Sequence, residues 1–220
     1  MQKLIFIVIP VVSVFNALAQ TPVRKEPRHH NVFENNYVRV LDVFIPPKDS
    51  TQFHLHNTPS VFTTFTKTVT GSQLKGEQPV STTSVAGYTW YDSLVAPRFH
   101  RVWNEDSNWF HVMDVELTGF VAQSNPAILN YSSLKLLFNA PLTNGYHLQL
   151  KPGSSIKFPL TKTGYLLISL ADAVIEYTVN NISQRRMMKA GHYIWIEPRD
   201  AAFINAVDDA KAGFTLLQLK

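Results

Sequence analysis

Two histidines separated by one residue, His54 and His56, have the type and spacing that best suit metal chemistry in this sequence. They lie in a segment that is typical of a β-strand, where side chains two residues apart project from the same face. Two neutral imidazoles directed at one point are a good start for a divalent metal site. A third ligand must come from a neighbouring strand, and His100 is the best candidate.

The elements that would position these side chains are short strands. Runs of five to nine residues, rich in β-branched and aromatic side chains, are bounded by Pro, Gly, Asn, Asp or Ser. Helical periodicity over twelve or more residues is missing, which argues against a parallel β/α architecture. We therefore predict an all-β protein built as a sandwich or barrel of antiparallel strands. The clearest runs are 37–45, 61–69, 109–117, 165–170, 174–179, 193–196 and 214–219.

An internal repeat predicts two copies of one fold. The segment 47–56 aligns with 152–161 at an offset of 152 − 47 = 105 residues, with Pro, Ser, Phe and Leu in matching places. Two further matches follow in the same order at similar offsets, the pairs Ala86-Gly87 with Ala190-Gly191 and Pro97-Arg98 with Pro198-Arg199. We predict one domain at 20–122, a linker at 123–131 and a second domain at 132–220.

The sequence resembles the bicupins, which carry two cupin domains in one polypeptide. The first cupin motif is matched by His54, His56 and Gly71, and the second by Gly87, Pro97, His100 and Asn104. The resemblance implies two tandem jelly-roll barrels, with one divalent metal ion inside the first, bound by His54, His56 and His100. The similarity is good over 37–118 and is one of fold pattern only over 141–220. Asn104 is expected to hydrogen bond backbone at a turn.

The sequence departs from the family at one ligand. The motif glutamate would fall at Ser60 or Val61, and neither side chain can replace a carboxylate. A three-histidine set leaves positions open for water and substrate, and it adds no charge to the ion, which would then attract an anionic or enolisable molecule. The alternative is that the glutamate was lost together with metal binding.

The second domain lacks all the predicted ligands. At the positions aligned with His54 and His56 it has Pro159 and Thr161, and at the position aligned with His100 it has Ala201. We therefore expect a degenerate cupin domain that is structural, or that packs as a lid on the first.

Three further residues are predicted to bind substrate. His111, in the alternating strand 109–117, could point into the barrel as an auxiliary base or ligand, or it could be a half-buried core histidine. Arg98 could bind a substrate carboxylate or be solvated at a strand end. Trp90 could line an apolar pocket or fill the core. His29 lies in a basic arm with His30, and both are expected to be solvated.

The predicted function is that of an exported, metal-binding cupin that acts on or binds a small organic molecule. The ion could be Zn, Fe, Ni, Cu or Mn, and the sequence does not decide whether the protein is an enzyme. The alternative is a metal-free cupin that binds a sugar or another small molecule without catalysis. A homodimer is compatible with this fold, whereas a net charge of +4 on scattered basic residues argues against a nucleic-acid partner.

The first residues resemble a secretory signal. A short positive start precedes an apolar run of about 14 residues, which is shorter than the roughly 20 that a membrane span needs. We predict a signal peptide at 1–19, cleavage before Gln20, a secreted or periplasmic location and no membrane anchor afterwards. The chain contains no cysteine, which excludes disulfides, thiolate metal sites and a cysteine nucleophile.

Overall fold

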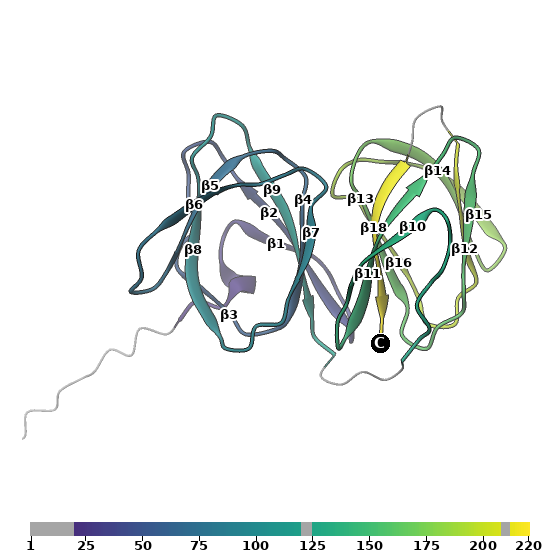
Figure 1. The fold of residues 1–220 in the computed structure, drawn as a ribbon, viewed down its shortest axis with the longest axis horizontal. Helices are drawn as coiled ribbons and strands as arrows, with labels where there is room; N and C mark the ends of the chain where they lie inside the picture. The colour runs from purple at the N-terminus through teal and green to yellow at the C-terminus, as the bar shows by residue number, and fades with distance from the viewer. Residues whose placement is uncertain (1–19, 120–124, 208–211) are drawn as a thin grey trace, which may run out of the picture.

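The protein consists of two β-barrels that lie side by side, as Figure 1 shows. The computed structural model describes residues 20–119, 125–207 and 212–220. The predicted signal peptide at 1–19 lies outside the described residues, as does part of the predicted linker at 123–131. No helix in the described part of the chain has the length and apolar character that crossing a membrane requires.

The first barrel pairs a five-stranded sheet, ordered β1-β2-β9-β4-β7, with a four-stranded sheet, ordered β3-β8-β5-β6, and all its strand pairs are antiparallel. A short 3₁₀-helix, η1 (Val23–Lys25), precedes them. The strands are β1 (His29–Glu34), β2 (Val38–Ile45), β3 (His54–His56), β4 (Ser60–Thr64), β5 (Val69–Leu74), β6 (Val80–Thr83), β7 (Thr89–Asp92), β8 (Arg98–Asn104) and β9 (Phe110–Leu117).

The second barrel repeats this topology with every strand number raised by nine. Its sheets run β10-β11-β18-β13-β16 and β12-β17-β14-β15. The prediction of an all-β protein with two tandem jelly-roll barrels is confirmed. The strands are β10 (Leu134–Asn139), β11 (Thr143–Leu150), β12 (Ser155–Phe158), β13 (Tyr165–Ser169), β14 (Ala173–Val179), β15 (Ile182–Met188), β16 (Tyr193–Ile196), β17 (Ala202–Ala206) and β18 (Ala212–Leu219).

The two five-stranded sheets pack against each other through a shared apolar cluster. Met113 and Val115 of β9 meet Leu166 of β13 and Leu217 of β18 in this cluster. Because side chains alternate along a strand, the other face of β9 is turned into its own barrel. Every residue of β9 is therefore buried, since one face contacts the second barrel and the other lines the interior of the first.

The interior of the second barrel is packed with apolar side chains where the first holds histidines. Pairing of β12 with β17 places Phe158 opposite Ala202, as pairing of β3 with β8 places His54 opposite His100. Phe158 and Ala202, each one residue away from the aligned Pro159 and Ala201, therefore form an apolar pair on these two strands. Both belong to a large buried cluster that fills this barrel.

The contact between the barrels should carry part of the stability. Leu217 is fully buried in the shared cluster, so Leu217→Ala should lower the free energy of unfolding by about 2–5 kcal/mol, because truncation removes apolar contacts and leaves a cavity. Leu160→Ala is the matched control, because Leu160 is 66% exposed, and it should change stability by less than about 0.5 kcal/mol. Urea unfolding followed by circular dichroism measures both, and equal effects would contradict the packing described.

Candidate metal centre

Strand pairing brings the three predicted histidines together inside the first barrel. His54 and His56 flank Leu55 on β3 and project inward, and β8 places His100 directly opposite His54. The ring centroids are 4.7 Å apart for His54 and His100, and 4.9 Å apart for His56 with either of the other two. Two separate segments of the chain therefore bring three imidazoles to one place.

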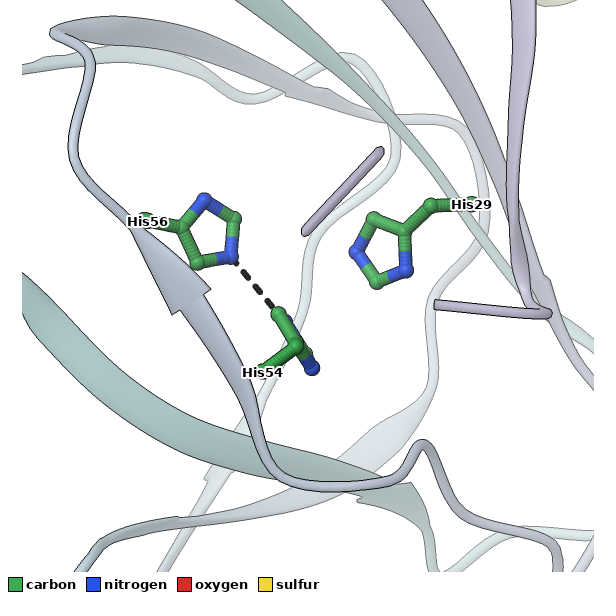
Figure 2. A group of neighbouring side chains, drawn as sticks. All are labelled: His29, His54 and His56. Atoms are coloured by element: carbon green, nitrogen blue, oxygen red, sulfur yellow. Dashed lines mark hydrogen bonds between the residues drawn. The ribbon is translucent and has the colours of Figure 1, made fainter. Parts of the chain in front are cut away.

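A fourth histidine, His29 of β1, joins this group from the opposite sheet, as Figure 2 shows. Its ring centroid lies 4.6 Å from that of His54, and the candidate ligand atoms of His29, His54 and His56 all lie within 4.8 Å of one another. The prediction that His29 is solvated is wrong, because its side chain is only 7% exposed. Its neighbour His30 is exposed.

Hydrogen bonds fix the orientation of two of these rings. Nδ1 of His54 donates to the carbonyl oxygen of Gln52 at 2.8 Å, and Nδ1 of His29 lies 2.7 Å from a carboxylate oxygen of Glu26. A neutral imidazole that donates through Nδ1 keeps a lone pair on Nε2. Because Nδ1 of each ring is engaged by Gln52 or Glu26, Nε2 is the atom of His54 and of His29 that can bind a metal ion. Metal-bound histidines usually have such a hydrogen-bond partner at their other ring nitrogen.

The donor atoms suit a divalent ion. Nε2 of His54 lies 3.0 Å from Nε2 of His56, and Nε2 of His100 is buried without a hydrogen-bond partner. Two nitrogen ligands bound to one ion at about 2.1 Å are roughly 3.0–3.4 Å apart at bond angles between 90° and the tetrahedral value. The spacing of His54 and His56 therefore fits a shared cation, and His100 lies beside them with an unpartnered nitrogen, although the ligand atoms that lie within 4.8 Å of one another are those of His29, His54 and His56.

Burial keeps these imidazoles neutral, as metal binding requires. It lowers the pKa of His54 to about 4 and, together with the nearby His54, lowers the pKa of His100 to about 3. Burial also lowers the pKa of His56 far below its usual range. At neutral pH the three rings offer lone pairs to a cation without first losing a proton.

The buried carboxyl group of Asp114 lies close to His56. Oδ2 of Asp114 lies 3.4 Å from Nδ1 of His56, and burial raises the pKa of Asp114 to about 8. Sequence reasoning missed Asp114, although an acidic residue inside the apolar strand 109–117 was the available signal. Val61, one of the two positions expected for the motif glutamate, faces the second barrel and belongs to the shared cluster.

The histidines lie in a cavity of about 490 Å³ that also contains Arg98 and Trp90. Arg98 is hydrogen bonded to Asp92, and its Nε is buried without a partner. The indole of Trp90 is stacked between Phe62, with centroids 5.1 Å apart, and Tyr88, with centroids 5.5 Å apart. These three aromatic side chains form one wall that extends from the interior to the exposed Tyr88.

His111 does not line this cavity. It projects from the other face of β9, where Nε2 lies 2.7 Å from a carboxylate oxygen of Asp42 and the ring stacks on Phe44 at 4.0 Å. The second barrel closes over it, because a Cβ on Gly191 would approach the ring to 2.7 Å. The expectation that His111 points into the barrel as a base or ligand is therefore wrong. Its surroundings are those of the other alternative, a histidine packed in the core.

The other motif residues support the backbone. Asn104 is buried and donates from Nδ2 to the carbonyl oxygens of Ile45 and Asn108, at 3.0 and 2.7 Å, which confirms its expected role at a turn. Gly71 permits close approach of Trp103, since a Cβ at this position would lie 1.9 Å from the indole ring.

Comparison with solved structures identifies the fold. A cupin 2 conserved barrel domain protein from Leptotrichia buccalis has a TM-score of 0.59 and 12% identity over 94% of both chains. This chain has the two-barrel cupin fold. A salicylate 1,2-dioxygenase from Pseudaminobacter salicylatoxidans has a TM-score of 0.60 and 7% identity over 83% of this chain and 70% of its own. An oxalate decarboxylase from Lactobacillus farciminis, in complex with formate, has a TM-score of 0.58 and 10% identity over 84% of this chain and 77% of its own.

The relation to these cupins is one of structure and not of close sequence similarity. No protein-family model matches the chain, and a search of curated proteins gives no match. At identities of 7–13%, the matched structures establish the fold, and the chemistry has to be argued from the site itself.

The buried histidines predict a loss of stability in mild acid. Each has a folded pKa below the usual histidine value of about 6.5, so its contribution to stability is complete above pH 6.5 and is lost as pH falls towards about 4 for His54 and about 3 for His100. Asp114 has the opposite effect, because its raised pKa makes the folded state more stable as pH falls. Its single proton is outweighed by the three histidines, whose combined effect lowers stability. We expect the metal-free protein to lose stability from pH 6.5 to 4.5 in urea unfolding.

The variant His100→Gln isolates this effect. Removal of one imidazole should reduce the slope of the free energy of unfolding against pH by up to about 1.4 kcal/mol per pH unit. This is the slope produced by one proton that the unfolded state binds and the folded state does not. An unchanged slope in the variant would show that His100 does not titrate between the folded and unfolded states as described.

Proposed function

We propose that the protein binds one divalent metal ion through His54, His56 and His100, and that the ion holds a small organic anion in the cavity of the first barrel. The observation that carries this proposal is the convergence of buried, neutral imidazoles with Nε2 atoms directed at one another or left without a partner. An ion bound there supplies Lewis-acid polarisation of a coordinated oxygen atom.

The residues around the histidines define what the cavity can accept. The volume of about 490 Å³ exceeds the size of a two-carbon acid and lies within the range of pockets for larger organic ligands. The stacked wall of Phe62, Trp90 and Tyr88 offers a flat apolar surface, and Arg98 places a positive charge within reach of the histidines. These features favour a planar molecule that carries an anionic oxygen.

The chain's own residues orient such a molecule and limit its contact with water. The apolar wall would pack on the planar part, while Arg98, whose Nε has no partner, would face the anionic group. The buried carboxyl group of Asp114, whose Oδ2 lies 3.4 Å from Nδ1 of His56, is placed to orient that ring. The names of two similar structures, a salicylate dioxygenase and an oxalate decarboxylase–formate complex, agree with an organic acid as ligand.

An exported location is part of the proposal and rests on the sequence of residues 1–19 alone. Binding of the ion would then take place after export, with metal supplied by the surroundings of the mature protein.

Metal content tests the proposal directly. Untagged protein purified without chelator should contain about one equivalent of a divalent transition metal by elemental analysis. The double variant His54→Ala/His56→Ala should contain less than about a tenth of that, because two of three ligands are removed. The control His192→Ala changes an exposed histidine of the second barrel and should keep the metal. Equal metal content in the double variant and its parent would remove the metal site and favour a metal-free binding protein.

Ligand binding tests the cavity. Salicylate serves as a planar anionic probe, and its affinity for the metal-loaded protein is measured by calorimetry. Trp90→Ala should weaken binding by roughly 10-fold, because it removes a stacked aromatic surface worth about 1–1.5 kcal/mol. Trp109→Ala is the matched control, because Trp109 is 54% exposed outside the cavity, and it should leave the affinity unchanged. Identical affinity before and after removal of the metal would contradict binding at the ion.

A further inference from the structure

The segment that precedes β1 is built into the wall of the metal centre. The backbone amide of Leu55, between His54 and His56, donates to the carbonyl oxygen of Thr21 at 2.8 Å, and Pro22 forms a parallel bridge with Leu55. Val23 is buried in an apolar cluster of the first barrel. We name residues 21–29 the amino-terminal arm, which is thereby fastened to the strand that carries two candidate ligands.

Glu26 connects this arm to the residues before β3. Its side chain is buried, and its carboxylate accepts hydrogen bonds from the backbone amides of Arg28 at 2.7 Å and Gln52 at 3.1 Å. The same carboxylate lies 2.7 Å from Nδ1 of His29. A carboxylate held by two amides has little freedom to move, so it fixes both the tautomer and the direction of the His29 ring.

The free Nε2 of His29 faces the other histidines. Ligand atoms that share one ion at bonds of about 2.1 Å can be no more than about 4.2 Å apart. The ligand atoms of His29, His54 and His56 lie within 4.8 Å of one another, so reaching the roughly 3.0–3.4 Å separations of a shared ion requires a pair of them to approach by up to about 1.8 Å through ring movement.

We propose that His29 is a fourth metal ligand, supplied by the amino-terminal arm, and that Glu26 is the positioning residue that holds it. The proposal rests on the proposed metal site and extends it. The ligand set is then four imidazoles without a carboxylate, which suits Zn, Cu, Ni and Fe better than Mn. The arm becomes part of the metal centre, because its backbone is hydrogen bonded to Leu55 of β3 and its His29 would share an ion with the two histidines of the same strand.

The experiment compares His29→Ala with His30→Ala, an adjacent control whose side chain is exposed on β1. Each purified full-length variant is loaded with Cu(II), and its affinity is measured by competition with a chelator. The number of coordinated nitrogens is read from electron paramagnetic resonance with its nitrogen hyperfine coupling. We expect His29→Ala to bind at least about 10-fold more weakly and to show one nitrogen fewer, whereas His30→Ala matches the parent protein.

Glu26→Gln tests the positioning role. It keeps the size of the side chain but weakens its pull on the Nδ1 proton, so Cu(II) affinity should fall by about 10-fold or more and the nitrogen count should fall with it, which a loss of stability alone would not produce. His29→Gln serves as a second variant if His29→Ala does not fold, as judged by circular dichroism. If a folded His29 variant binds Cu(II) with the same affinity and the same number of nitrogens as the parent protein, the proposal is overturned.

The outcomes separate this inference from the proposed function. If the His54→Ala/His56→Ala protein loses the metal and the His29 variants retain all nitrogens, the metal site stands and the fourth ligand is refuted. If the double variant retains the metal as well, the proposed function fails and this inference fails with it.

Discussion

The candidate site of the first barrel depends on a cluster of imidazole rings that the two sheets withdraw from bulk water. Burial makes protonation of His54, His56 and His100 costly, so the rings stay neutral and present lone pairs. Those lone pairs face one another, with Nε2 of His54 and Nε2 of His56 3.0 Å apart. Such an arrangement is favourable when a proton or a cation lies between the nitrogens, and the proposed ion satisfies it for the whole cluster.

The two barrels share a topology and differ in what fills them. The second places Phe158 opposite Ala202 in a continuous apolar core, whereas the first places His54 opposite His100 beside a cavity. A cavity and buried polar groups lower the stability of a domain. The contact between the five-stranded sheets adds apolar burial on the outer face of the first barrel, which offsets part of that cost.

Much of the fold followed from local pattern, because alternation of apolar residues and turn residues is a local property. The offset of 105 residues between 47–56 and 152–161 predicted two copies, and the two sets of sheets have the same strand order. The spacing of His54 and His56 predicted that the two rings share a face, and strand pairing adds His100 to them. Whether the three bind metal remains a prediction, as do the domain limits and the signal peptide.

The parts of the site that sequence reasoning missed depend on long-range packing. Nothing near His29 in the sequence shows that its side chain meets those of β3 from the opposite sheet, and the neighbouring basic residues suggested exposure to solvent instead. The strand that carries His111 and Asp114 alternates as expected, but alternation does not say which face turns inward. Packing of the second barrel on β9 decides this, and it places His111 against Gly191 and Asp114 behind His56.

The sequence by itself determined the strands, their duplication and the shared face of the paired histidines, because each of these follows from backbone geometry over a few residues. The tertiary structure alone decided which face of each strand became interior and which distant side chains completed the cluster. Those outcomes depend on how one sheet buries its apolar face against another, and this interaction is set by the whole chain and not by any segment of it.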